Sequence, residues 1–538
     1  MTITESSLRR RVPLIAALAA LTLCLCAPQA LARYVYTGNY ETDDVSVIDT
    51  ATNQVVAGPI PVGIDPSTLA ITPDGKTLIV GAEGGDNLTI IDTQSNQVVT
   101  TIPLTFEGVS QEASTIAIAP NGKTAYVLSY SLEGILVLDL QTNQIVGSPI
   151  PIGPEPWGVA FSPDGSFAYA TTLENDEIVV IDTASRQPVD SIPVGEEPRN
   201  VAFAPDGKTA YVVNEEENSV SVIDTQSRAV VGDPILVGDS PWGVAVNPTG
   251  SRAYVSNRSD DSVSVIDTQA RQVVGGPISI GESPYELAVT PDGKSVYVAD
   301  YEGESVSVID TQSNQVATTV PVPGGPWQLA IVPDQSPTAS FTAAATKQPL
   351  ALTFSGLGST DPDGTIARYD WNFGDGATLA GGDPVPTHSY AKAGAYPVSL
   401  TVVDTEGCSV NMVFTGRTAH CSGSTSASAA QTVTVQAPSK VPNKFKFGKL
   451  KRNTRKGTAK LTILVPAAGK IVLAGKKVKR AQRSAKKAGK VTVNIRPKPQ
   501  AKKQLAQKGS AKVRVKVTFS PTGGDQLTKS RSVKLIQR

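Results

Sequence analysis

Residues 201–225 read VAFAPDGKTAYVVNEEENSVSVIDT, and this stretch decides the fold. The apolar run 201–203 leads into Pro205-Asp206-Gly207-Lys208, a turn sequence in which proline fixes φ and glycine allows the open conformation. Residues 211–214 and 220–224 form two further β-type runs, and no helical periodicity appears. The stretch therefore predicts three antiparallel strands, and residues 230–237 supply an outer fourth.

The same unit occurs seven times, each copy ending its third strand with an aspartate. These residues are Asp49, Asp92, Asp139, Asp182, Asp224, Asp267 and Asp310, at spacings of 42 to 47 residues. A regular period with only strand signals predicts a seven-bladed β-propeller of four-stranded blades over residues 33–334. Residues 34–39 begin at a second strand and 327–331 form an unpartnered first strand, so we expect these ends to pair and close the ring.

Several copies resemble the YVTN family of β-propeller repeats. Tyr211-Val212-Val213-Asn214 and Tyr254-Val255-Ser256-Asn257 carry the likeness, as do the Ser-Val-Ser-Val-Ile-Asp-Thr runs that end at Thr225, Thr268 and Thr311. The second copy departs from the pattern with Leu78-Ile79-Val80-Gly81. The resemblance covers about residues 34–334 and implies a surface-layer type of protein. YVTN repeats also resemble lactonase-type propellers, which implies a channel with polar and acidic residues.

One position of the repeat varies between copies, just before each inner strand. Its occupants are Ser67, Ser114, Trp157, Arg199, Trp242, Tyr285 and Trp327. Because inner strands begin around the mouth of the channel, we predict a ligand-binding rim of Trp157, Arg199, Trp242, Tyr285 and Trp327 for a sugar, peptide or cationic group. The alternative is that these rings only pack between blades. The loops of this face are rich in Asp and Glu, with Arg199 and Arg258 as almost the only opposing charges.

A second domain is predicted over residues 335–436. Residues 359–364 (STDPDG) and 371–376 (WNFGDG) resemble the PKD domain, an Ig-like β-sandwich that implies protein or carbohydrate contacts. Asp361, Asp363 and Asp375 are candidate Ca²⁺ ligands, with turn stabilisation as the alternative. Cys408 and Cys421 are expected to form a disulfide at the base of an insertion before the last strand.

Residues 437–443 read as a linker and residues 444–538 as a small basic β-sandwich-like domain. Residues 441–538 hold 29 Lys and Arg against Asp525 alone, whereas residues 33–440 hold 47 Asp and Glu against 16 Lys and Arg. Lys512, Arg514 and Lys516 alternate with valines, which predicts one cationic face. The tail resembles lysine-rich C-terminal modules of exported bacterial proteins. An anionic cell-wall polymer or membrane phosphate is the expected partner, and a merely solvated surface is the alternative.

The N-terminus, residues 1–32, reads as a secretory signal peptide. Arg9, Arg10 and Arg11 precede an apolar run over 14–25, and Ala30-Leu31-Ala32 offers small residues for cleavage. The run is short for a membrane span, with an uncleaved anchor as the alternative, and no later segment is apolar enough for one. We therefore expect a secreted protein associated with the cell envelope, with no transmembrane segment after signal removal. Export also argues against a nucleic-acid partner.

Catalysis has little support in the sequence. The only two histidines, His388 and His420, fall outside the predicted propeller, which excludes histidine-bound copper there. The repeated Asp is explained as a turn residue. We expect a cell-surface binding or adhesion protein with no catalytic residues and no cofactor beyond the candidate Ca²⁺. The alternatives are a secreted lactonase-like hydrolase that uses the propeller channel and a structural surface-layer component.

Overall fold

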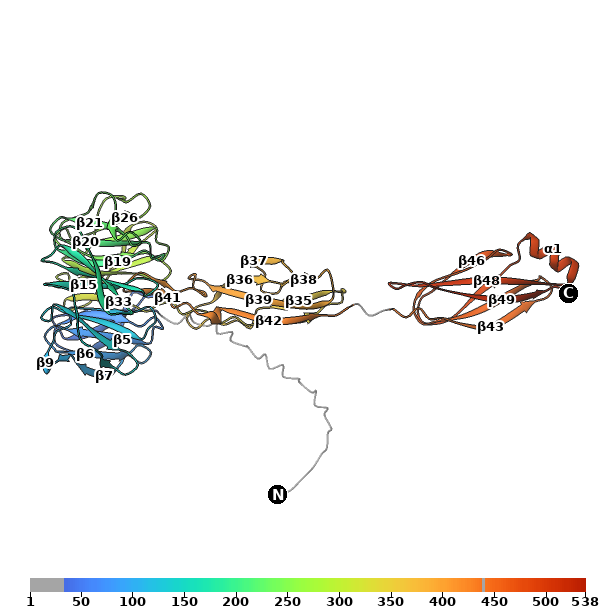
Figure 1. Ribbon diagram of the computed structural model, residues 1–538, viewed down its shortest axis with the longest axis horizontal. Coiled ribbons are helices and arrows are strands. Elements are labelled where there is room, and N and C mark those ends of the chain that lie inside the picture. The colour runs from blue at the N-terminus through green and yellow to red at the C-terminus, as the bar shows by residue number, and fades with distance from the viewer. Residues whose placement is uncertain (1–32, 438–440) are drawn as a thin grey trace, which may run out of the picture. The chain divides into compact units, whose positions relative to one another are not determined.

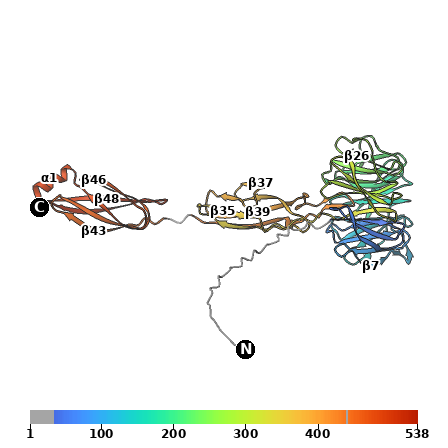
Figure 2. The ribbon, with the colours of Figure 1, turned by 180° about the vertical axis from the view of Figure 1, so that it is seen from behind.

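The computed structural model describes residues 33–437 and 441–538 and is drawn in Figures 1 and 2. The expected signal peptide 1–32, with Cys24 and Cys26, lies outside the described residues, as do residues 438–440 of the expected linker. The fold is all-β, with 56% strand and 3% helix. It divides into two compact units, the first with the propeller and the Ig-like domain, the second with the basic C-terminal domain.

Seven radial antiparallel sheets make up the propeller among the described residues. Three blades have an outer strand split into two short pieces. The strands, grouped by blade, are β1 (Tyr34–Asn39), β2 (Asp44–Asp49), β3 (Gln54–Pro61) and β33 (Pro326–Ile331); β4 (Pro66–Ile71), β5 (Thr77–Ala82), β6 (Asn87–Asp92) and β7 (Gln97–Pro103); β10 (Thr115–Ile118), β11 (Thr124–Ser129), β12 (Gly134–Asp139), β13 (Gln144–Ile145) and β14 (Ile150–Pro151); β15 (Pro156–Phe161), β16 (Phe167–Thr172), β17 (Glu177–Asp182) and β18 (Gln187–Pro193); β19 (Pro198–Phe203), β20 (Thr209–Asn214), β21 (Ser219–Asp224), β22 (Ala229–Val230) and β23 (Ile235–Leu236); β24 (Pro241–Val246), β25 (Arg252–Asn257), β26 (Ser262–Asp267), β27 (Gln272–Val273) and β28 (Ile278–Ser279); β29 (Pro284–Val289), β30 (Ser295–Asp300), β31 (Ser305–Asp310) and β32 (Gln315–Pro321). A small hairpin, β8 (Thr105–Phe106) with β9 (Val109–Ser110), precedes β10.

The blade β19 to β23 shows how the repeat folds. Asp206 accepts a hydrogen bond from the backbone N–H of Lys208 in the first turn, and Gly207 has φ of 70°. Asp224 accepts from the backbone and hydroxyl of Ser227, which confirms its reading as a turn residue. Asn214 donates to two serine hydroxyls of β21 and so joins the second and third strands.

The two ends of the propeller pair as expected. Strand β33 lies antiparallel to β1, with Val35 opposite Ile331 and Thr37 opposite Leu329. The inner strands β4, β10, β15, β19, β24, β29 and β33 contact one another in a closed circle around the channel. The ring therefore has no open edge between its first and last strands.

The Ig-like domain is a sandwich of two sheets closed over an aromatic core. Trp371, 2% exposed, packs against Phe341 and Phe354, and Phe373 completes the core. The strands are β34 (Thr342–Ala345), β35 (Ala351–Ser355) and β38 (Thr387–Ser389) in one sheet and β36 (Ile366–Asn372), β37 (Thr378–Gly382), β39 (Gly394–Asp404) and β42 (Ser428–Val435) in the other. The expected Cys408–Cys421 disulfide is present. It closes a loop that holds β40 (Val413–Phe414) and β41 (Ala419–Cys421), and a 3₁₀ turn at Thr425–Ala427 follows this loop.

The basic domain is also a two-sheet sandwich. Its strands are β43 (Lys446–Asn453), β44 (Thr458–Val465) and β47 (Gly489–Ile495) in one sheet and β45 (Gly469–Gly475), β46 (Val478–Ala485), β48 (Ser510–Pro521) and β49 (Leu527–Ile536) in the other. Lys512, Arg514 and Lys516 are exposed on β48 while the intervening valines are buried. One helix, α1 (Pro499–Lys508), was not expected; Pro499 begins it and Gly509, with φ of 62°, ends it. No helix of residues 33–437 or 441–538 has the length and hydrophobicity to cross a bilayer.

Candidate functional site in the propeller channel

The five predicted rim residues lie together at the channel mouth and are called the rim cluster: Trp157, Arg199, Trp242, Tyr285 and Trp327. The rings of Trp157 and Trp242 meet edge to face with centroids 5.3 Å apart. Tyr285 stacks on Trp327 at 3.9 Å, and Trp242 contacts both of these rings edge to face. Because Trp157 and Trp242 come from blades that are not neighbours, the rings pack across the mouth as one aromatic layer.

Two arginines cover this layer. The Arg199 guanidinium lies 4.6 Å from the centre of the Trp157 ring and 4.8 Å from that of Trp242. Arg258 lies over Trp242 at 5.2 Å. Glu215, only 6% exposed, binds both guanidinium groups, that of Arg258 at 3.1 Å. One buried carboxylate thus holds two cations against the aromatic rings.

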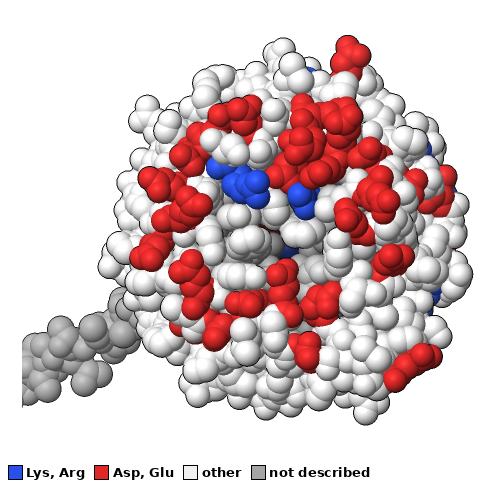
Figure 3. Space-filling model, turned by 90° about the vertical axis from the view of Figure 1, so that its left-hand side faces the viewer, with Lys and Arg blue, Asp and Glu red and all other residues white. Residues whose placement is uncertain are grey.

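The rim cluster is only partly accessible. Trp242 and Tyr285 are 4% and 9% exposed, whereas Trp157, Arg199 and Trp327 are half-buried. Two aromatic residues that the sequence did not single out join the layer: Tyr40 stacks on Trp327, and Tyr301 meets it edge to face. Figure 3 shows Asp and Glu spread around a central hollow, with a few Lys and Arg close to it.

Deeper in the channel, three polar side chains converge on one arginine. Arg417 Nη1 donates to Glu286 Oε2 at 2.9 Å and to Asn200 Oδ1 at 3.2 Å, and its Nη2 donates to Gln328 Oε1 at 3.2 Å. The channel acceptors Asn200, Glu286 and Gln328 come from β19, β29 and β33. Arg417 comes from the Ig-like domain, at the tip of the channel hairpin β40–β41 (residues 413–421).

The channel hairpin enters the ring at the far ends of the inner strands from the rim cluster. The backbone N–H groups of Phe161 and Phe203 donate to the carbonyls of Gly416 and Thr415, both at 3.0 Å. Phe414 is buried among propeller residues. The space left between the hairpin and the inner strands is a cavity of about 40 Å³. This volume holds a few water molecules but no substrate-sized molecule.

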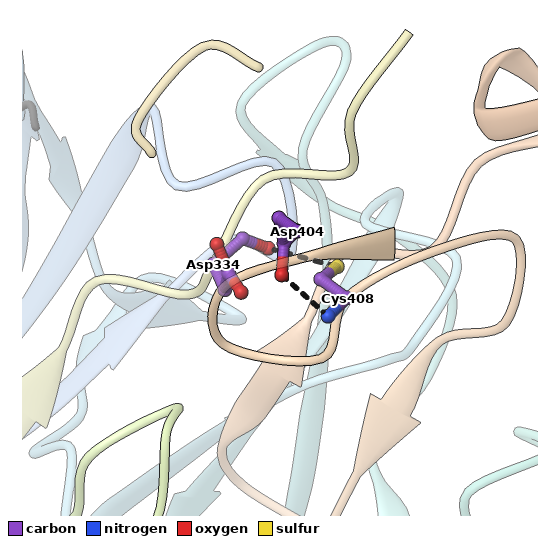
Figure 4. Close-up of side chains that lie close together, drawn as sticks. All are labelled: Asp334, Asp404 and Cys408. Carbon is purple, nitrogen blue, oxygen red and sulfur yellow. Dashed lines mark hydrogen bonds between the residues drawn. The ribbon is translucent and has the colours of Figure 1, made fainter. Parts of the chain in front are cut away.

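A second polar cluster lies where the Ig-like domain follows the propeller. The junction cluster consists of Arg33 and five carboxylates. Asp334, Asp363 and Glu406 pair with Arg33, and Asp361 and Asp404 lie beside these carboxylates. Arg33 binds Asp334 at 2.7 Å and Glu406 at 3.4 Å. Figure 4 shows Asp334 and Asp404 beside Cys408, whose backbone N–H donates to Asp404 at 2.8 Å. Because Cys408 is in the disulfide, its sulfur is no thiolate ligand.

The junction cluster has the donors that a hard cation such as Ca²⁺ requires. Asp363 and Asp404 are 8% and 2% exposed, and each has one carboxylate oxygen without a hydrogen-bond partner. Burial, with repulsion from neighbouring carboxylates, raises the pKa of Asp361 to about 7. One arginine leaves several of these charges uncompensated. Asp375, the third candidate ligand, does not share this cluster's contacts; it pairs with His388 Nε2 at 2.9 Å.

Sequence reasoning found the rim cluster but missed the channel acceptors. They occupy the position that directly follows the variable one, where the other copies carry Thr68, Thr115, Gly158 and Gly243. The change at this position from Thr or Gly to Asn, Glu and Gln could have indicated these residues as candidate site residues. No sequence pattern indicated a role for Arg417, because its contacts depend on how a second domain docks.

Sequence and structure comparisons find partial relatives. A microbial collagenase from Vibrio alginolyticus is 41% identical over 90 residues, 16% of this chain and 11% of that protein. The collagenase ColA of Clostridium perfringens is 45% identical over 56 residues, 10% of this chain and 5% of that protein. The chain therefore spans about a tenth or less of the length of these curated relatives.

Solved structures with a similar propeller include the periplasmic gluconolactonase of Pseudomonas aeruginosa, 23% identical, with a TM-score of 0.47 over 56% of this chain and 99% of that one. A functionally unknown protein of Desulfotomaculum acetoxidans is 20% identical, with a TM-score of 0.48 over the same shares. Two family models also match: a PKD domain at residues 334–418 and a lactonase, 7-bladed beta-propeller, at residues 151–321. The chain thus contains a lactonase-type seven-bladed propeller followed by a PKD domain.

Proposed function

We propose that this chain is an extracellular binding protein whose rim cluster recognises a protein or carbohydrate ligand. The propeller and the PKD domain together fit an extracellular protein. The observation that carries the proposal is the half-buried pair Trp157 and Arg199 at the channel mouth. A rigid indole beside a guanidinium offers a stacking surface and several hydrogen-bond donors at low entropic cost. The small cavity beneath favours recognition at the surface over capture inside the channel.

The basic domain is proposed to bind an anionic cell-wall polymer. Its support is the exposed row Lys512, Arg514 and Lys516 on β48, together with the excess of Lys and Arg over residues 441–538. Such binding is electrostatic and weakens as salt screens the charges. The basic domain would then hold this protein at the cell envelope while the rim cluster recognises its ligand.

The junction cluster is proposed to hold one Ca²⁺ as a structural ion. Asp334 and Asp404, whose ligand oxygens lie within 4.8 Å of one another, would supply carboxylate oxygens, and Asp361 and Asp363 stand beside them in the same cluster. When bound, the ion would neutralise carboxylates that are otherwise buried close together. This role is structural and assigns no catalytic step to the ion.

A glycan and surface-protein array tests the rim proposal on the full chain. We expect a ligand whose signal falls at least about tenfold in Trp157→Ala and in Arg199→Ala, as hot-spot aromatic and arginine residues do. Tyr130→Ala is the matched control, because Tyr130 is an aromatic residue that is 43% exposed and lies outside the rim cluster. A ligand whose binding the rim variants leave unchanged places recognition elsewhere and refutes the proposal.

Sedimentation with washed cell walls tests the role of the basic domain. The full chain is compared with the triple variant Lys512→Gln, Arg514→Gln, Lys516→Gln at low and at 0.5 M salt. We expect less bound variant at low salt and little binding of either protein at high salt. Equal binding at both salt concentrations would exclude the electrostatic role.

A secreted lactonase-like hydrolase is the second candidate, favoured by the family match over residues 151–321 and by the buried Glu286 in the channel. Such an enzyme needs the channel open. Gluconolactone hydrolysis by the full chain, by Arg417→Ala and by Arg417→Ala with Glu286→Gln tests it. Hydrolysis that requires Glu286 would support the enzyme; no hydrolysis above the buffer rate by the full chain or by Arg417→Ala would exclude this substrate.

A further inference from the structure

The channel acceptors are grouped at one level of the inner strands. In the other copies this position holds either glycine or a threonine engaged between strands. Thr68 Oγ1 accepts from the N–H of Ile116, and Thr115 Oγ1 donates to the carbonyl of Trp157. Asn200 keeps such a contact, since its Nδ2 donates to the carbonyl of Trp242 at 3.2 Å, and its Oδ1 remains for a further partner. Glu286 and Gln328 place long polar side chains where the other copies have threonine or glycine.

The acceptors match the shape of a guanidinium group. Asn200 and Glu286 accept from Nη1 of Arg417 and Gln328 accepts from Nη2, so three acceptors from three blades surround one planar fork. Only Glu286 among the three is charged, and its side chain is 7% exposed. An ammonium group, as a compact point donor, fits such a spread of acceptors less well.

The channel hairpin holds this arginine firmly. The Thr415 N–H donates to the Thr418 carbonyl, which makes Gly416 and Arg417 the two residues of the turn. Gly416 has φ of 105°, and a Cβ there would lie 3.0 Å from Ala160 Cβ and 3.1 Å from the Phe203 ring. The tip is thus seated closely against the inner strands, and a side chain at residue 416 would require its neighbours to shift and would strain the positive φ.

We propose that Asn200, Glu286 and Gln328 form a guanidinium-binding site inside the propeller channel, and that Arg417 is its tethered occupant, which blocks the channel from the side of the PKD domain. An arginine side chain of another polypeptide, or a small guanidinium compound, can occupy the site only when the hairpin tip is absent or withdrawn. This site is separate from the rim cluster and does not depend on the proposed surface recognition.

The test restores the missing group with a small molecule. In the full chain, Arg417→Ala removes the occupant, and thermal unfolding of the propeller is followed while methylguanidine is added at constant ionic strength. We expect a saturating rise in Tm of at least about 2 °C in Arg417→Ala and none in the wild type, whose site is filled. Methylammonium is the matched control ligand, and Arg417→Ala with Glu286→Gln is the matched control variant; neither should give the rise.

A methylguanidine effect absent from Arg417→Ala, or equalled by methylammonium, overturns the proposal. Should Arg417→Ala lose its cooperative transition, Arg417→Gln replaces it. The proposal then predicts that adding Glu286→Gln raises the Tm of Arg417→Gln, because the second change removes an unpaired buried charge. A double variant no more stable than Arg417→Gln would also refute it. The rim variants Trp157→Ala and Arg199→Ala should leave all these results unchanged, which keeps the two proposals distinguishable.

Discussion

The guanidinium of Arg417 and the carboxylate of Glu286 lie 2.9 Å apart, although 131 residues separate them in the sequence. One comes from the PKD domain and the other from an inner strand of the propeller. Their pairing fixes the hairpin tip inside the ring and divides the channel into a partly accessible rim and a blocked interior. This division directs recognition toward the rim cluster.

The fit of the hairpin tip can be measured with glycine substitutions. Gly416→Ala should destabilise the first unit by about 1–3 kcal/mol more than Gly376→Ala, as overpacking in a filled space does. Both glycines have positive φ, 105° and 95°, but a Cβ at Gly376 meets nothing within 4 Å. Denaturant unfolding of both variants measures the difference. Equal losses would mean that backbone strain alone matters and that the tip is not tightly seated.

Calcium should stabilise the first unit through the junction cluster. Replacing EDTA by Ca²⁺ at about 100 times its Kd should add about 2.7 kcal/mol to the free energy of unfolding. Asp404→Asn should lose most of this gain, because the carboxyl is buried and one of its oxygens has no hydrogen-bond partner. Asp375→Asn is the control, since Asp375 pairs with His388. Equal loss in both variants would contradict the proposed ligand set.

Asp300 should make stability depend on pH. It stands where other blades carry Asn214 or Asn257, it accepts hydrogen bonds from Ser305 and Ser307, and burial raises its pKa to about 7. The folded state therefore keeps a proton that the unfolded chain releases near pH 4, so stability falls as pH rises from about 4 to about 7. At about 1.4 kcal/mol per pKa unit, the loss is at most about 4 kcal/mol.

Asp300→Asn should remove this fall, because the asparagine amide does not titrate. The amide can also donate to the two serines, as Asn214 does to Ser219 and Ser221, so the local structure should be kept. The difference between the variant and wild-type stability curves, measured by denaturant unfolding from pH 4 to 9, isolates the effect. Asn214→Asp should introduce a similar fall in its own blade. Parallel wild-type and Asp300→Asn curves would show that Asp300 does not titrate in this range.

The sequence predicted the parts of the fold that local chemistry determines. Pro-Asp-Gly turns, alternating strands and the separated halves of one blade at residues 34–39 and 327–331 were enough for seven closed blades. The helix α1 was missed because only Ala501 and Leu505 of its ten residues are buried, which leaves almost no apolar period to read. The rim cluster was predicted because it breaks the repeat, whereas the roles of Arg417 and Arg33 arise only from docking between domains.

The most direct measurement is amide hydrogen exchange at Phe161 and Phe203 in the full chain. Their N–H groups face the channel and donate only to hairpin carbonyls, whereas those of the next residues, Ser162 and Ala204, donate within their blades. If the hairpin fills the channel, the two phenylalanine amides are protected about as strongly as their neighbours. Rapid exchange at Phe161 and Phe203 beside slow exchange at Ser162 and Ala204 would show an open channel and contradict the account.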